Sequence, residues 1–367
     1  MDISEFIEVA KNLNVLGIKV TQDGELIAEW HSEPECRRNI YSATKSFTSC
    51  AVGFAVQEGL ISLDEKLTDA FSEDLPDSID DNLKAATVRD LLTMCLGQEQ
   101  GSLMGEQRPL YKEDDWVKMS LSIPFKYKPG THFVYNNVGP YLAGILVQRR
   151  SGCDLVSYLT PRLFSHLEIK RPTWETDPLG NSFGAGGLFL TLSELHKFGL
   201  FYLNKGKWNG SQILSEKWIE ESTKAADVKH YGYLFWRGEY NSFRADGKYC
   251  QISMILPDKI KLLLIPFRAV SLPALLQPPP GGEAHITHQD RALRRKIGPQ
   301  RPEKGIFFFV PQVLTFSVFC GIIDFVHSDD SFRIGVWLLN STTESSLWIL
   351  FFTIAASFYN LQPINFW

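Results

Sequence analysis

The stretch NIYSATKSFTSCAVGFAVQEG, residues 39–59, decides the fold and also raises the main functional question. Its apolar side chains recur at three- and four-residue intervals, as at Phe47, Cys50 and Phe54, which predicts a helix over residues 46–56. Gly59 suits the C′ position, where a helix commonly ends. The stretch therefore predicts a helix that is buried on most of its circumference.

Lys45 is out of place at the start of this helix. A cation in the first turn opposes the helix dipole by about 0.3–1 kcal/mol and loses hydration on burial. Both effects favour the neutral amine, which is a base. Ser42 lies three residues earlier on the same helix face, so Lys45 can take the proton of its hydroxyl. The structural alternative is that Ser42 caps the helix, and one Ser-x-x-Lys pair is expected by chance in about this length of chain.

Composition excludes several classes of protein. The chain has 367 residues with 44% apolar content, enough for one large or two ordinary domains, and its net charge of -5 argues against a general nucleic-acid binder. The N-terminus has no basic segment or cleavage site of a signal peptide, which predicts a cytoplasmic protein. No spaced set of metal ligands and no phosphate-binding loop is present, so we expect neither a metal nor a cofactor.

The order of elements predicts an α+β fold. A hairpin with the turn residues 22–24 follows an N-terminal helix, and strands return at residues 231–238 and 242–266. We expect the hairpin and the late strands to share one antiparallel sheet flanked by helices, with the other helices in a second subdomain. Helices are expected over residues 2–12, 87–97, 138–152, 155–167 and 191–206.

Three further motifs follow the Ser-x-x-Lys pair in order. They are PGTHFVYNN, which ends in Tyr135-Asn136-Asn137, the glycine-rich GAGGL of residues 184–188, and ADGKYCQ of residues 245–251. With this ordered set, residues 14–266 resemble the serine β-lactamase and penicillin-binding-protein superfamily. The similarity is greatest to the branch of class C β-lactamases, D-alanyl-D-alanine carboxypeptidases and related esterases.

The resemblance implies a serine hydrolase acting on a small-molecule ester or amide. Ser42 would be acylated, Lys45 and Tyr135 would share the proton transfers, and Asn137 would bind the amide on the acyl side of the substrate. Asp246 and Gly247 would form the far wall, and the backbone N–H groups of Ser42 and Lys248 would bind the oxyanion. The alternative is a sensor or binding module that is acylated but does not turn over.

The third motif departs from the family pattern. Lys or His, then Thr or Ser, then Gly is usual there, whereas this chain has Ala245-Asp246-Gly247. An acidic side chain should repel a substrate carboxylate, which favours neutral esters or amides, or amine-bearing substrates. Arg244 or Lys248 could restore the missing cation.

The chain changes character after residue 267. We expect a hydrolase domain over residues 1–267, a disordered, basic, Pro/Gly-rich linker over 268–305, and an apolar tail of uncertain fold over 306–367. The apolar run 306–323 reaches the lower limit of a membrane span but contains Pro311 and Gln312, and the run 346–358 is shorter than a bilayer needs. Membrane contact through the tail is therefore the lesser alternative. A fused segment or an altered reading frame would also fit this change.

Overall fold

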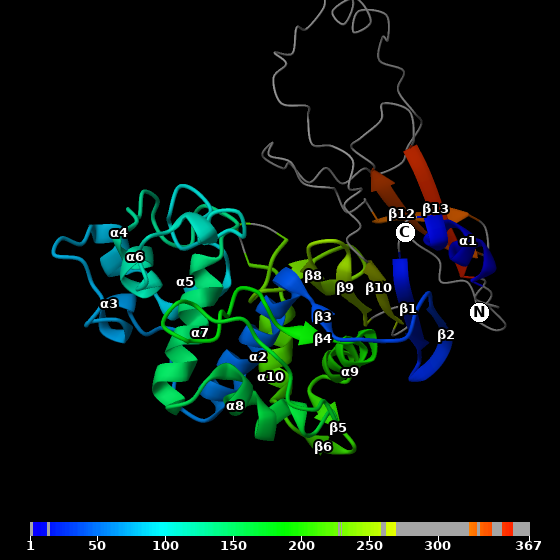
Figure 1. Ribbon diagram of the computed structural model, residues 1–367, viewed down its shortest axis with the longest axis horizontal. Coiled ribbons are helices and arrows are strands. Elements are labelled where there is room, and N and C mark those ends of the chain that lie inside the picture. Colours follow the sequence, from blue (N-terminus) through cyan, green and yellow to red (C-terminus); the bar gives the residue numbers. More distant parts are fainter. Residues whose placement is uncertain are drawn as a thin grey trace, which may run out of the picture. The chain divides into compact units, whose positions relative to one another are not determined.

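The computed structural model describes residues 3–12, 15–226, 228, 230–257, 262–268, 323–328, 331–339 and 347–354. Contacts divide the chain into two compact units, one of which is Val15–Arg268 (Figure 1). The other unit contains, among its described residues, helix α1 (Ser4–Asn12) and an antiparallel sheet of β11 (Ile323–Ser328), β12 (Ser331–Leu339) and β13 (Leu347–Ile354). The predicted linker, residues 268–305, lies outside the described residues except for its first, and the domain boundary stays a prediction.

No helix in the described part of the chain is both long enough and apolar enough to cross a membrane. Of the two apolar runs in the tail, 306–323 lies outside the described residues except for its last residue, and 346–358 contains strand β13.

A six-stranded antiparallel sheet forms one side of the unit Val15–Arg268. Its strand order is β2-β1-β10-β9-β8-β7. The N-terminal hairpin therefore pairs directly with β10, the last strand of this unit, as expected. Asp23 and Gly24 form the hairpin turn with φ of 50° and 89°, the left-handed conformation that a two-residue hairpin requires. The strands are β1 (Val15–Gln22), β2 (Glu25–His31), β7 (Trp236–Arg237), β8 (Phe243–Gly247), β9 (Gln251–Leu256) and β10 (Leu262–Arg268).

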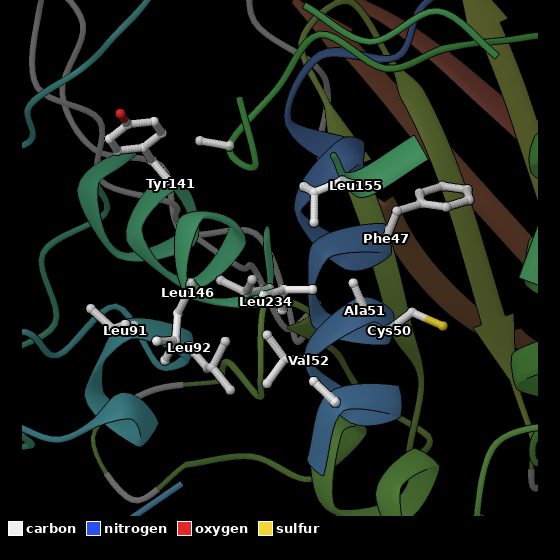
Figure 2. Close-up of a cluster of buried hydrophobic side chains, with 14 of the residues drawn as sticks. Phe47, Cys50, Ala51, Val52, Leu91, Leu92, Tyr141, Leu146, Leu155 and Leu234 are labelled. Atoms are coloured by element: carbon white, nitrogen blue, oxygen red, sulfur yellow. The ribbon is translucent and has the colours of Figure 1, made fainter. Parts of the chain in front are cut away.

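Helix α2 (Thr44–Gln57) is the buried helix that the opening stretch predicts. Every residue from Thr44 to Ala55 is buried, and Gly59 follows the helix with a φ of 74°. Figure 2 shows its apolar side chains beside those of α5 and α7. The Phe47 ring stacks on that of Phe198, with 3.8 Å between the ring centroids. The predicted α+β class with a helical subdomain is therefore confirmed.

Three of the remaining helices pack against α2 or the sheet. Helix α9 lies against β1, β9 and β10, while α7 and α8 contact α2 (Figure 1). The remaining helices of the unit are α3 (Leu67–Ala70), α4 (Asp81–Ala85), α5 (Val88–Leu92), α6 (Trp116–Ser122), α7 (Val138–Ser151), α8 (Leu155–Leu159), α9 (Leu192–Leu203) and α10 (Glu216–Thr223). The short elements are β3 (Arg38–Asn39), β4 (Phe189–Leu190), β5 (Lys207–Trp208), β6 (Ser211–Gln212), η1 (Tyr41–Ala43), η2 (Arg108–Leu110) and η3 (Thr160–Phe164).

Two expected helices are shorter than the sequence pattern indicates. The helix expected over 87–97 is α5, which ends at Leu92 because Met94 and Gly97 have φ of 59° and 106°. The helix expected over 155–167 changes after Leu159 into the π-helical turn η3, where Pro161 lacks the N–H that an α-helix would use. Apolar periodicity alone does not reveal either change.

Candidate active site

Ser42 lies in the turn η1, immediately before α2, and does not cap that helix. Ala43 occupies the N-cap position and no side chain makes a capping bond there. Tyr41, the residue before Ser42, has a φ of 48°, and its backbone N–H donates to Asn39 Oδ1 at 2.7 Å. The capping alternative is thus wrong, and the Ser42 hydroxyl is available to another partner.

That partner is Lys45. Its side chain is 1% exposed, and Nζ lies 2.9 Å from Ser42 Oγ and donates to the Ala185 carbonyl at 2.7 Å. Burial lowers the pKa of Lys45 to about 7, with a smaller contribution from the positive charge of Arg108. A large share of the molecules therefore carries a neutral amine at neutral pH, in hydrogen-bond contact with the hydroxyl.

The glycine-rich segment 184–187 brings the Ala185 carbonyl to Lys45. A Cβ on Gly184 would lie 2.5 Å from the Pro140 carbonyl oxygen, and one on Gly187 would lie 2.4 Å from Glu175 Cβ. The Gly184 carbonyl accepts from Thr48 Oγ1 at 2.6 Å, which ties the segment to α2. Close packing therefore explains Gly184 and Gly187, whereas a Cβ on Gly186 would meet no atom nearer than 3.8 Å.

Tyr135 faces both members of the pair. Its ring centroid is 5.2 Å from Lys45 Nζ, and its phenol interacts with Ser42. The ring stacks on Trp236 at 5.6 Å. Burial raises the pKa of the Tyr135 phenol; the hydrogen bond with Ser42 opposes part of this rise, and the charge of Asp246 makes a still smaller contribution that raises the pKa. The phenol therefore remains protonated at neutral pH and can donate a proton.

Asn137 is buried at the start of α7 with an acceptor left over. Asn136, not Asn137, makes the helix-start bond, because Asn136 Oδ1 accepts from the Gly139 N–H at 3.0 Å. Asn137 Nδ2 donates to the Leu103 carbonyl at 2.8 Å, and within the described chain its Oδ1 has no hydrogen-bond partner. The expected role in binding a substrate amide remains a prediction, and the free atom is an acceptor.

The end of β8 lies against the turn that carries Ser42. A Cβ on Gly247 would be 2.2 Å from the Ile40 carbonyl oxygen and 3.2 Å from the Ala43 nitrogen. Only glycine allows this approach, which brings the third motif beside Ser42 as the resemblance implies.

Asp246 is not an unopposed negative charge. Its Oδ2 accepts from Arg244 Nε at 2.9 Å, with both side chains about one quarter exposed. Arg244 thus reduces the repulsion expected of Asp246, but this pairing does not leave Arg244 as a free cation for a substrate carboxylate. Lys248 is exposed, with Nζ 5.1 Å from the ring centroid of Tyr249.

Three residues near the site have no pattern in the sequence that marks them. Glu175 accepts from Asn39 Nδ2 at 3.0 Å, and Arg108 Nη1 lies 3.4 Å from the other carboxylate oxygen of Glu175. Asn39, Arg108 and Glu175 come from three distant parts of the chain, so only folding brings them together. The residues that the structure describes include no group of three His, Cys, Asp or Glu placed to hold a metal ion.

Curated proteins are similar to this chain in sequence. A curated relative, an uncharacterised protein of Alkalihalophilus pseudofirmus, is 26% identical over 48% of this chain and 51% of its own length. The 6-aminohexanoate-dimer hydrolase of Paenarthrobacter ureafaciens is 23% identical over 60% of this chain and 61% of its own length. The chain thus spans about half to three fifths of the length of these curated relatives.

Solved structures agree on the fold. The structure of a Bacillus anthracis protein assigned as a 6-aminohexanoate-dimer hydrolase has a TM-score of 0.61 at 20% identity. The match covers 71% of this chain and 75% of that one. A penicillin-binding protein of Bacillus halodurans has a TM-score of 0.57 at 18% identity, covering 71% of this chain and 94% of that one. The sequence model of the Beta-lactamase family matches residues 9–265, and the chain belongs to this family.

Proposed function

We propose that the chain is a serine hydrolase that cleaves an ester or amide through an acyl-enzyme on Ser42. One observation carries the proposal. The Lys45 amine is buried, lies 2.9 Å from Ser42 Oγ, and forms no ion pair with a carboxylate of the described residues. A buried lysine that only stabilised the fold would be expected to pair with an acid, whereas this one contacts a nucleophile.

The first half of the reaction forms the acyl-enzyme. Lys45 Nζ takes the proton of Ser42 Oγ while the oxygen attacks the substrate carbonyl carbon. The backbone N–H groups of Ser42 and Lys248 stabilise the resulting oxyanion. As the tetrahedral intermediate collapses, the Tyr135 phenol protonates the leaving oxygen or nitrogen, and Lys45 returns its proton to the phenolate.

The second half releases the acid. Water takes the place of the leaving group, and the Lys45/Tyr135 pair removes its proton as it attacks the acyl carbonyl. Collapse of the second intermediate breaks the bond to Ser42 Oγ, which takes a proton back. Because the amine and the phenol form one coupled unit, we assign the base to both together.

The charges beside Tyr135 bear on the substrate. Asp246 and Arg244 neutralise one another, so this wall offers neither a free cation nor the hydroxyl of the usual third motif. We propose a leaving group that is uncharged or carries an amine. One curated relative is a 6-aminohexanoate-dimer hydrolase, and we propose the same broad reaction type for this chain.

Stopped-flow hydrolysis of p-nitrophenyl acetate tests the proposal. The full chain should release a burst of one equivalent of p-nitrophenolate followed by a steady rate, and Ser42→Ala should show neither. Ser49→Ala is the matched control, since Ser49 is a nearby serine that is buried on α2, and its hydroxyl has no hydrogen-bond partner in the described structure. A burst that survives in Ser42→Ala would refute the nucleophile, and a burst without turnover would favour the sensor alternative.

A further inference from the structure

The turn that carries Ser42 is held in an unfavourable backbone conformation. Tyr41 has a φ of 48°, which costs a residue other than glycine on the order of 1–3 kcal/mol. The bond from the Tyr41 N–H to Asn39 Oδ1, at 2.7 Å, offsets part of this cost. The position of Ser42 therefore depends on the Asn39 side chain.

Glu175 fixes the orientation of that side chain. A carboxylate only accepts hydrogen bonds, so the Asn39 atom 3.0 Å from Glu175 Oε1 must be Nδ2, and Oδ1 must face Tyr41. Glu175 is itself anchored, because its backbone N–H donates to the Gly187 carbonyl and its own carbonyl accepts from the Phe183 N–H, each at 2.8 Å. The intervening segment presents the Ala185 carbonyl to Lys45.

Arg108 completes this arrangement from the other side. Its Nη1 lies 3.4 Å from Glu175 Oε2, and its guanidinium lies 4.5 Å from the ring centroid of Phe183. Its Nε is buried and has no hydrogen-bond partner within the described chain. The guanidinium is thus held over the segment that contacts Lys45, and its charge acts on that amine.

We propose that Asn39, Glu175 and Arg108 form a clamp that positions Ser42 and Lys45 relative to one another. The proposal rests on the proposed function, because it assigns positioning residues to the same nucleophile and base. The chain of contacts runs from the Ser42 turn through Asn39 and Glu175 to Arg108, and Glu175 also joins it to the support of Lys45. A displacement of about 1 Å between nucleophile and base is enough to lower the rate about 100-fold.

An exchange of amide and carboxylate tests the link between Asn39 and Glu175. Asn39→Asp should lower kcat/KM about 10- to 100-fold, because two carboxylates would then face each other. Glu175→Gln should lower kcat/KM less, by about three- to tenfold, because its carbonyl oxygen can still accept from Asn39 while its amide nitrogen then faces the donor Arg108 Nη1. The double variant should recover to within about threefold of Glu175→Gln, because the amide introduced at position 175 can donate to the new carboxylate. Melting curves verify that each variant is folded at the assay temperature.

Arg108→Gln tests the remaining member through the pH profile of kcat/KM. The groups facing Lys45 are Ser42, Tyr135 and Arg108, with Asp246 acting on Tyr135. Loss of the guanidinium charge should raise the pKa of Lys45, because the positive charge no longer disfavours the protonated amine. The acidic limb of the kcat/KM profile should therefore move to higher pH. Arg162→Gln is the matched control: this arginine also pairs with a glutamate, Glu58, and lies 3.9 Å from the Tyr158 ring centroid, with 30% exposure against 27% for Arg108. Its pH profile should not change.

Three results would overturn the clamp: full activity of Asn39→Asp, a double variant no better than Asn39→Asp, or an acidic limb that Arg108→Gln leaves in place. None of these three results would change the burst of p-nitrophenolate that the proposed function predicts for Ser42. Failure of the clamp is therefore distinguishable from failure of the proposed function.

Discussion

Replacement of Lys45 by Met should abolish hydrolysis and, at neutral pH, stabilise the fold. Met has a similar length and no charge, and the amine it removes is 1% exposed. The pKa of Lys45 falls from 10.5 in an unfolded chain to about 7 in the folded protein. Folding at neutral pH must therefore either bury a cation or release its proton.

The size of this effect follows from linkage. The difference between 10.5 and about 7 corresponds to on the order of 5 kcal/mol at most, all of it opposing folding below about pH 7. The variant also loses the bonds to Ser42 and to the Ala185 carbonyl, worth about 1 kcal/mol each, and leaves the buried carbonyl unpaired. We expect Lys45→Met to be more stable than the wild type by about 1–3 kcal/mol near pH 7.

The sign of the pH dependence is specific. The unfolded chain binds more protons than the folded one between about pH 7 and 10.5, so the wild type gains stability as pH rises through this window. Lys45→Met has no such group and should not gain. The advantage of the variant should shrink with rising pH and vanish or reverse near the upper end, where the lysine is neutral in both states.

Urea unfolding at several pH values, followed by tryptophan fluorescence, measures this difference. Lys217→Met is the control, because the Lys217 side chain is 83% exposed and its loss should have nearly the same small effect at every pH. A stability difference between wild type and Lys45→Met that is constant from about pH 7 to 10 would refute the argument. In the wild type, kcat/KM should rise with pH through about 7 as Lys45 loses its proton.

Three further substitutions probe the site. Tyr135→Phe should lower kcat/KM, which reports acylation, about 10²- to 10⁴-fold on an alkyl amide but less on a p-nitrophenyl ester, because p-nitrophenolate leaves without a proton; equal losses on both would contradict a donor role. Asp246→Thr should raise the rate on substrates with a free carboxylate, by freeing Arg244, and leave neutral esters unchanged; equal gains on both would show that Asp246 does not face the substrate. Gly247→Ala should cost activity and about 1–3 kcal/mol of stability, measured by urea unfolding, because its methyl group would lie 2.2 Å from the Ile40 carbonyl oxygen. The control Gly105→Ala meets no atom within 4 Å, and equal behaviour of the two would refute the close approach.

Local patterns predicted most of the architecture. The apolar spacing after Lys45 indicated a buried helix, and the Asp23-Gly24 turn indicated a hairpin because few residues other than glycine and Asn or Asp adopt its left-handed conformations. Where local chemistry interrupts a periodic run, the prediction was too long, as at Met94 and Pro161. These are backbone effects that apolar periodicity does not encode.

The candidate site divides in the same way. The sequence by itself predicted that Ser42 and Lys45 lie close together, because three residues separate them, although Ser42 lies in η1 and not on α2. It also determined that a cation at a buried helix start is costly. It also marked Tyr135 and Gly247, through motifs that the family resemblance gathers into one site. Each of these depends on short-range spacing or on residue type.

Only the tertiary structure decided the environment of those residues. The 2.7 Å bond from Lys45 to the Ala185 carbonyl, the pairing of Arg244 with Asp246, and the lowered pKa of Lys45 all depend on contacts and burial created by folding. Asn39, Glu175 and Arg108 meet although 136 and 67 positions separate the contacting pairs. A pKa depends on desolvation and on charges in space, and the linear order of residues contains neither until the chain has folded.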